Sequence, residues 1–155
     1  VRVCSDNPLL QANTFPTLLQ EAEKNKADYV SYGFSDGTPV IKSHLGLFSE
    51  AVTLEALEKA STCTTDKLYL EHVTNYLYTH QDDFDIRLLQ LPKQVEERKD
   101  LRFTLDTPDD FSLLQEVYKR WIEETDRSLE SLIRLVESES KYKNSMKKNI
   151  QQNTK

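Results

Sequence analysis

The sequence predicts an α/β domain, because short β-rich runs alternate with segments of helical periodicity. The run 1–4 (V-R-V-C) is followed by a helical pattern and then by a second β-rich run, 28–32, an order typical of a βαβ unit with parallel strands. Near the other end, the run 101–105 alternates apolar and polar residues and leads into a helix that begins with Pro108. We therefore expect 1–4 to be an interior strand of a sheet that is larger than these residues can build.

The length and the charge limit the classes of function. A chain of 155 residues suits one domain, and 37% hydrophobic residues are enough to form its core. The net charge of -6 argues against a surface for DNA or RNA, which would show clustered Lys and Arg. A local site for a phosphorylated small molecule remains open, because a metal ion there would offset the repulsion.

The cysteines and the apolar runs predict the cellular compartment. Cys4 and Cys63 have neither zinc-like spacing nor a disulfide framework around them, which favours a reducing environment. No apolar run is long enough to cross a bilayer, and the first residues do not resemble a signal peptide. We expect no membrane contact and a cytoplasmic location.

The first predicted helix follows a cluster of turn formers at 5–8 (S-D-N-P). We expect Asn13 or Thr14 to cap it. Its inner face is expected to consist of Phe15, Leu18, Leu19 and Ala22. The strand 28–32 (D-Y-V-S-Y) comes next and completes the predicted βαβ unit.

The middle of the chain has less regular patterns. The segment 40–48 carries β-branched and aromatic residues and is expected to be extended. Thr53 is expected to cap a short helix, and a longer helix is predicted over 66–80. The inward-facing residues of the longer helix would be Leu70, Val73 and Leu77. Alternation over 84–88 then predicts a strand.

In the last third, the helix from Pro108 follows the turn Asp106-Thr107 and has acidic residues in its first turn, where the helix dipole favours them. An apolar stripe that we expect to be core continues it: Phe111, Leu114, Val117, Tyr118 and Trp121. A final helix is predicted over 129–136. We divide the chain into a domain over 1–138 and a polar, mobile tail over 139–155, because the residues after 138 have little to bury.

Familiar catalytic and phosphate-binding motifs are absent from the sequence. Its three glycines, Gly33, Gly37 and Gly46, cannot form a G-x-G-x-x-G pattern or a P-loop. There is no G-x-S-x-G, no H-E-x-x-H and no cysteine pair for zinc. A hydrolase triad is therefore not predicted.

Two carboxylates are candidates for binding a metal. Asp6 and Asp106 each follow a predicted strand, at the end where open α/β sheets bind their ligands. Two hard oxygen ligands suit Mg²⁺, which takes one or two carboxylates and fills its other positions with water and phosphate. The alternative is structural, since Asp6 lies in a turn and Asp106 lies at a helix start, where both have local roles.

Four further polar residues are candidates for substrate binding. Glu71 and His72 are adjacent on the helix 66–80, where such a pair binds a sugar hydroxyl or a carboxylate; the alternative is a solvated helix face. Lys42 and His44 lie on the segment 40–48, where His44 either faces a ligand or is an ordinary half-buried histidine.

Three segments resemble the motifs of one family. The turn 5–9 (S-D-N-P-L) resembles a G-D-x-P-L motif, 71–76 (E-H-V-T-N-Y) resembles an E-H-V-T-x-Y helix, and 101–110 resembles a strand followed by D-T-P-E-D. Together, and in this order, they resemble the cytidylyltransferases of spore-coat polysaccharide synthesis. That family is similar to the acylneuraminate and keto-deoxy-octulosonate cytidylyltransferases. The resemblance extends over most of the chain up to about residue 125.

The resemblance implies a Rossmann-like nucleotide-diphospho-sugar transferase fold. It also implies transfer of a cytidylyl group from CTP to an acidic or surface-polysaccharide sugar, with Mg²⁺ and with release of pyrophosphate. By position, Asp6 and Asp106 match the carboxylates that hold the metal, and Glu71 and His72 fall where the sugar is recognised. Lys42 and His44 complete the expected substrate-binding set.

The resemblance has two departures. Ser5 stands where the family has glycine. The chain also matches only the C-terminal portion, without the first strand and the Gly- and Arg/Lys-rich loop that grips the triphosphate, so we expect no transferase activity from it alone. Alternatives are a non-catalytic sugar-binding or dimerisation module, with a homodimer formed through the helices from Pro108 and Ser128, and a sugar-phosphate nucleotidyltransferase that uses another base.

Overall fold

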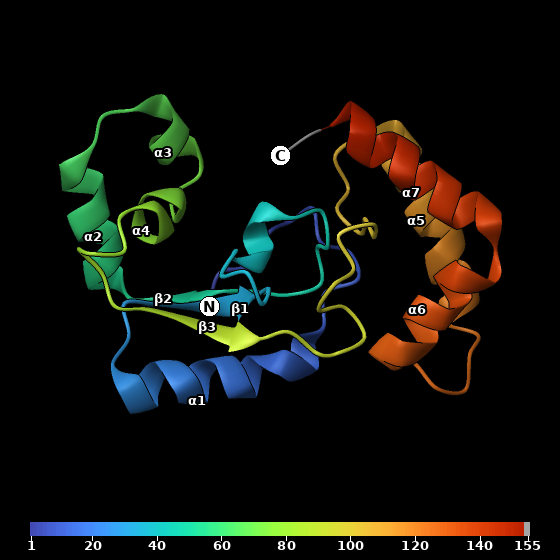
Figure 1. Ribbon diagram of the computed structural model, residues 1–155, viewed down its shortest axis with the longest axis horizontal. Coiled ribbons are helices and arrows are strands. Elements are labelled where there is room, and N and C mark those ends of the chain that lie inside the picture. Colours follow the sequence, from blue (N-terminus) through green and yellow to red (C-terminus); the bar gives the residue numbers. More distant parts are fainter. Residues whose placement is uncertain (154–155) are drawn as a thin grey trace.

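A small mixed sheet lies at the centre of the computed structural model, which describes residues 1–153 (Figure 1). Its strand order is β2-β1-β3, with β1 at Tyr29–Gly33, β2 at Ala51–Val52 and β3 at Ile86–Gln90. β1 pairs with β3 in parallel, in a register that places Tyr29 opposite Ile86, and with β2 antiparallel. The predicted strands 28–32 and 84–88 are therefore confirmed within two residues.

The strand β1 is buried along its whole length, because it has a partner strand on each side and helices around it. α1 (Phe15–Asn25) packs along one face of the sheet. It follows a short 3-10 helix, Ala12–Thr14, and ends at Lys26, whose φ is 52°. Its buried residue is Leu18, whereas Leu19 is 42% exposed, so the predicted inner face is wrong at Leu19.

The predicted βαβ unit is wrong in its first strand. The run 1–4 forms only one antiparallel bridge, between Arg2 and Glu50, and the parallel partner of β1 is β3. The run 101–105 is extended and bonds to loops: Phe103 N–H donates to His44 O at 2.9 Å and Leu105 N–H donates to Asp6 O at 2.8 Å. Alternation thus identified extended segments, but not the strands that they lie beside.

Three helices gather beyond one end of the sheet: α2 (Leu54–Cys63), α3 (Lys67–Glu71) and α4 (Asn75–Thr79). The cap of α2 is confirmed, because the Thr53 side chain accepts a hydrogen bond from Ala56 N–H. The single helix predicted over 66–80 is wrong, since the chain leaves helical conformation at His72. The reason is tertiary: Thr74 turns inward to a buried hydrogen bond with Glu50. Leu77 of the predicted inner face is buried, while Leu70 and Val73 are exposed.

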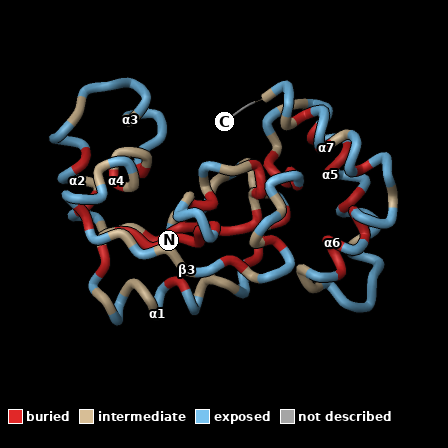
Figure 2. The backbone as a smooth tube through the Cα atoms, viewed as in Figure 1, coloured by how far each residue is buried: buried red, intermediate tan, exposed pale blue. Residues whose placement is uncertain are grey.

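The other helical group contains α5 (Pro108–Trp121), α6 (Leu129–Ser138) and α7 (Ser140–Gln152). Figure 2 shows buried stretches along all three, with exposed stretches between them. The helix predicted over 129–136 is confirmed. The expectation that residues after 138 have little to bury is wrong, because Tyr142 and Met146 are fully buried on α7. Residues 154 and 155 of the predicted tail lie outside the described residues.

The helix α5 begins with a capping box, in which the Thr107 side chain and Asp110 satisfy each other's backbone N–H groups. Leu114 and Val117 of the predicted apolar stripe are buried. Phe111 and Tyr118 are 51% and 47% exposed, so the core assignment is wrong for these two aromatics. Because the helix has 3.6 residues per turn, Phe111 and Tyr118 lie on a neighbouring, exposed stripe of α5, beside the buried stripe that contains Leu114 and Val117.

Segments without regular structure connect the sheet and the group α2–α4 with the group α5–α7. Residues 40–48 were expected to be extended, but they open with a 3-10 helix, Val40–Lys42. The main core contains side chains of this segment, of 101–105, of α1 and of α5 to α7. A smaller cluster lies between the sheet and the helices α2 and α4, and its buried members are Tyr29, Ala56, Ala60, Leu77 and Phe84.

Candidate active site

A cleft of about 750 Å³ lies between the α3–α4 turn and the run that precedes α5. Its walls come from the N-terminal segment, the 40–48 segment, the α3–α4 turn and the run before α5. The charged and polar lining includes Arg2, Asp6, Lys42, His72, Thr104 and Asp106. The tertiary fold therefore brings residues of four distant segments to one cavity.

Both predicted metal ligands line this cleft. The backbone hydrogen bond from Leu105 to the Asp6 carbonyl holds the two carboxylate-bearing segments side by side. Asp6 Oδ1 is buried and has no hydrogen-bond donor within residues 1–153. Burial of such an oxygen is costly, and a bound cation would remove that cost.

The residues present are suitable ligands for Mg²⁺. No group of three or more His, Cys, Asp or Glu residues suited to a metal occurs within residues 1–153. Two carboxylates are nevertheless sufficient, because Mg²⁺ retains several waters and binds substrate phosphates. Asp6 and Asp106 would hold the ion, with the remaining positions taken by water and a phosphorylated substrate.

Behind Asp106, the guanidinium of Arg102 forms a buried ion pair with Asp110. Arg102 Nε and Nη2 each lie 2.7 Å from an oxygen of Asp110, and both side chains are 1% exposed. Burial alone would raise the pKa of Asp110, but hydrogen bonds from Arg102, Asn149 and Thr107 hold that pKa well below its usual range. Asp110 therefore carries a negative charge that Arg102 neutralises.

His44 is part of this buried network and does not line the cleft. Its Nδ1 lies 2.5 Å from Arg102 Nη1. A guanidinium can only donate, so His44 Nδ1 accepts and carries no proton in this arrangement. His44 is therefore a buried histidine in this structure and does not face the cleft.

Glu50, which is 1% exposed, supports two of the side chains that border the cleft. Its carboxylate accepts hydrogen bonds from Arg2, from Tyr29 Oη at 2.5 Å and from Thr74 Oγ1 at 2.9 Å. Burial, and then the charge of Glu50, raise the pKa of Tyr78 to about 12, so its hydroxyl stays protonated. Glu50 thus orients Arg2 and Thr74, which border the cavity.

The remaining predicted substrate residues divide into two groups. Lys42 and His72 are exposed and line the cleft, with Lys42 Nζ 6.0 Å from the centre of the Tyr78 ring. Glu71 is exposed at the end of α3 and lies outside the lining. The structure therefore brings Asp6, Asp106, Lys42 and His72 together and leaves Glu71 and His44 aside.

Several cleft residues escaped the sequence analysis, among them Arg2, Thr74, Tyr78 and Thr104. Thr104 and Arg102 were visible only as the polar positions of an alternating run. Thr74 lies in the E-H-V-T-N-Y segment, where the acid and the histidine are the residue types typical of a binding site. For Arg2 no sequence signal was available, because its partner Glu50 is 48 residues away.

Known proteins share this sequence pattern and this fold. An uncharacterized protein of Methanocaldococcus jannaschii is 36% identical over 121 residues, which are 78% of this chain and 46% of that protein. The spore coat polysaccharide biosynthesis protein SpsF of Bacillus subtilis is 26% identical over 137 residues, covering 88% of this chain and 53% of SpsF. No protein-family model matches the chain.

A solved structure of a cytidylyltransferase from Leptospira borgpetersenii superposes with a TM-score of 0.65. The match covers 92% of this chain and 56% of that structure, at 19% identity. It confirms the predicted α/β nucleotidyltransferase fold, and with SpsF it confirms the predicted resemblance to cytidylyltransferases and spore-coat proteins. The chain spans about half the length of these proteins. Within residues 1–153, no helix is both long and apolar enough to span a membrane.

Proposed function

We propose that this chain is part of a nucleotidyltransferase that transfers a cytidylyl group from CTP to a sugar. The observation that carries the proposal is the pair Asp6 and Asp106, which line one cleft and include a buried carboxylate oxygen that has no donor among residues 1–153. The likeness to SpsF and to the Leptospira cytidylyltransferase supports this choice among α/β functions.

The reaction places few chemical demands on protein side chains. A sugar hydroxyl oxygen bonds to the α-phosphorus of CTP, the bond to the bridging oxygen breaks, and pyrophosphate and the hydroxyl proton are released. Positioning and charge neutralisation provide most of the acceleration in phosphoryl-type transfer. Bound Mg²⁺ would supply a positive charge at the phosphate oxygens.

The side chains of the cleft divide these tasks. Asp6 and Asp106 would hold the cation at one end, with Asp106 kept in place by Arg102. Arg2, Lys42 and His72 border the same cavity and would orient an acidic or phosphorylated part of the substrates. The volume of about 750 Å³ is large enough for a substrate-sized molecule.

The test measures pyrophosphate release from CTP by the protein at its gene-encoded length, with Mg²⁺ and a panel of acidic and neutral sugars. We expect Asp6→Asn and Asp106→Asn each to lower turnover by about 100-fold, the scale of losing one electrostatic contact to the transition state. Asp109→Asn is the matched control, because Asp109 is an exposed acid at the start of α5. Equal turnover in all three variants would contradict the proposal.

The same assay, with a binding titration of the sugars beside it, separates the alternatives. Turnover with GTP or UTP in place of CTP would indicate a transferase for another base. Sugar binding without turnover by any nucleotide would indicate a binding module.

We also place the protein in the cytoplasm and propose a homodimer through α5, supported by the exposed Phe111 and Tyr118. Sedimentation of wild type and Phe111→Ser tests the dimer.

A further inference from the structure

Two donors fix one oxygen of Asp106 and leave the other open. Arg102 Nη2 donates to Asp106 Oδ2 at 2.8 Å, and Thr104 Oγ1 donates to the same oxygen at 2.9 Å. No hydrogen bond to Asp106 Oδ1 occurs within residues 1–153. The Asp106 side chain is 35% exposed at the edge of the cleft, so Oδ1 is the oxygen available to a ligand.

One of these donors, Arg102, is itself held by the buried carboxylate of Asp110. Asp110 accepts from Arg102 through both of its oxygens and also from the backbone N–H of Asp106 at 3.1 Å. Arg102 is 1% exposed and Thr104 is 2% exposed, so neither turns to water without disrupting the core. The side chain and the backbone of Asp106 are therefore fixed by the same network.

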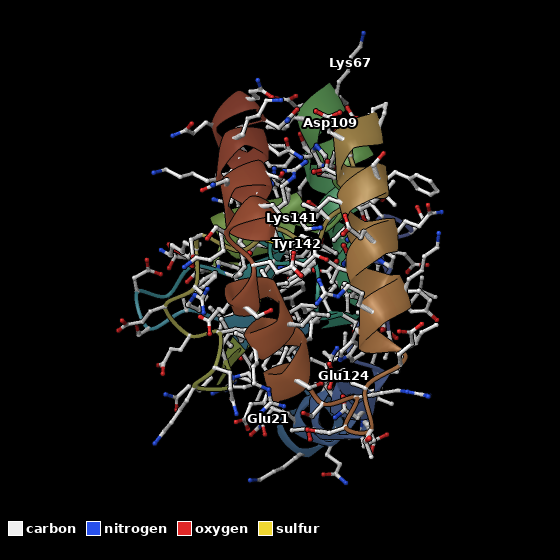
Figure 3. The ribbon with its side chains drawn as sticks, turned by 90° about the vertical axis from the view of Figure 1, so that its right-hand side faces the viewer. Glu21, Lys67, Asp109, Glu124, Lys141 and Tyr142 are labelled. Carbon is white, nitrogen blue, oxygen red and sulfur yellow. The ribbon has the colours of Figure 1, made fainter. Side chains whose placement is uncertain are left out.

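The network reaches the C-terminal helix. Asn149 of α7 is 3% exposed, and its side-chain amide donates to Asp110 Oδ1 at 2.9 Å. Figure 3 shows α5 and α7 side by side, with Tyr142 labelled between them. Asn149 satisfies the Asp110 oxygen that Arg102 Nε also contacts, and so it helps to hold Arg102 in place.

We propose that Thr104 and Asn149 are positioning residues of the candidate cation site. Thr104 acts directly on Asp106, and Asn149 acts through Asp110 and Arg102. Hydrogen bonds behind a metal ligand orient it before the ion binds, and their loss typically weakens metal affinity by 10–100-fold. This inference rests on the proposed function, because it requires Asp106 to be a cation ligand.

The test titrates the chain with Mn²⁺ alone, as a paramagnetic stand-in for Mg²⁺, and follows binding by electron paramagnetic resonance. Thr104→Val keeps the side-chain shape and removes the donor, so we expect about 10-fold weaker binding. Thr104→Ser restores the hydroxyl, and its affinity is expected within about twofold of wild type. Asn149→Ala is expected to weaken binding by about threefold or more, since it acts through two side chains.

The matched control is Asn144→Ala, an exposed asparagine on α7 whose removal should leave affinity unchanged. Circular dichroism at the titration temperature shows whether each variant is folded. If Asn149→Ala does not fold, the comparison of Thr104→Val with Thr104→Ser decides the outcome.

Asp106→Asn separates failure of the inference from failure of the proposed function. If Asp106→Asn loses Mn²⁺ binding while folded Thr104→Val and Asn149→Ala bind as wild type does, the positioning role is overturned and the cation site stands. If Asp106→Asn also binds as wild type does, the cation site is wrong and the inference fails with it. Lower thermal stability with unchanged affinity means a purely structural role.

Discussion

Gly46 packs directly against the backbone of Thr104. A Cβ atom at Gly46 would lie 2.9 Å from the Thr104 nitrogen and 2.9 Å from the Phe103 carbonyl carbon, closer than real side chains approach backbone. Gly46 also has a φ of 58°, in the left-handed region. The absence of a side chain at this position lets the 40–48 segment lie against the run that carries Asp106.

We expect Gly46→Ala to destabilise the protein more than Gly37→Ala does. Both glycines have positive φ, which costs an alanine about 1–2 kcal/mol, but nothing lies within 4 Å of a Cβ at Gly37. The close backbone approach at Gly46 should add about 1–3 kcal/mol. Urea denaturation measures both variants, and equal losses would show that the contact with Thr104 relaxes freely.

The buried carboxylate of Glu50 should be sensitive to loss of charge. Glu50→Gln keeps the volume but replaces one acceptor oxygen with a donor, facing Tyr29 and Thr74, which already donate. We expect a loss of about 1–3 kcal/mol in the free energy of unfolding. Glu58→Gln, at an exposed position of α2, should change it by less than about 0.5 kcal/mol. If Glu50→Gln also loses less than about 0.5 kcal/mol, the hydrogen bonds around Glu50 rearrange to accept the amide.

Helix α7 should contribute strongly to stability. Met146 is fully buried, so Met146→Ala should cost about 2–5 kcal/mol through lost burial and the cavity left behind. Lys147→Ala, one residue further on the exposed side, is the control. Chemical denaturation followed by the single tryptophan reports both variants, because Trp121 donates to Ser131 between α5 and α6. Similar midpoints would indicate that α7 is not docked.

The Arg102–Asp110 pair predicts a loss of stability in acid. The pKa of Asp110 is lowered in the folded state, so its contribution is fully present above the unfolded value near 4. That contribution is lost as the pH falls below about 4 toward the folded pKa. Urea denaturation at pH 7, 4 and 3 should show a smaller fall in stability for Asp110→Asn than for wild type. Parallel falls in both proteins would mean that other carboxylates cause the whole acid effect.

Local patterns predicted the features whose partners lie close in sequence. The cap at Thr53 and the start of α5 at Pro108, with acidic residues in its first turn, depend on residues within one helical turn, so the sequence alone contains the partners. The strands 28–32 and 84–88 followed from β-rich composition and alternation. The placement of Asp6 and Asp106 in one cleft was anticipated from their positions after extended runs.

Burial and long-range pairing decided the rest. The helix predicted over 66–80 breaks because Thr74 bonds to Glu50, which is 24 residues away. Arg2 bridges Glu50 rather than joining a parallel strand, so the first βαβ unit does not form. Such contacts depend on which segments fold together, and periodicity within one segment carries no information about them.

The sequence by itself determined the α/β class, the cap of α2, the start of α5 at Pro108 and the two carboxylates at the ends of extended runs. Only the tertiary structure decided that His44 supports the site from behind, that Glu71 lies outside the cleft and that Asn149 belongs to the network around Asp106. The physical reason is that a buried polar group must find a partner wherever the fold provides one. Here that partner often comes from a distant segment, as Asn149 does for Asp110, 39 residues away.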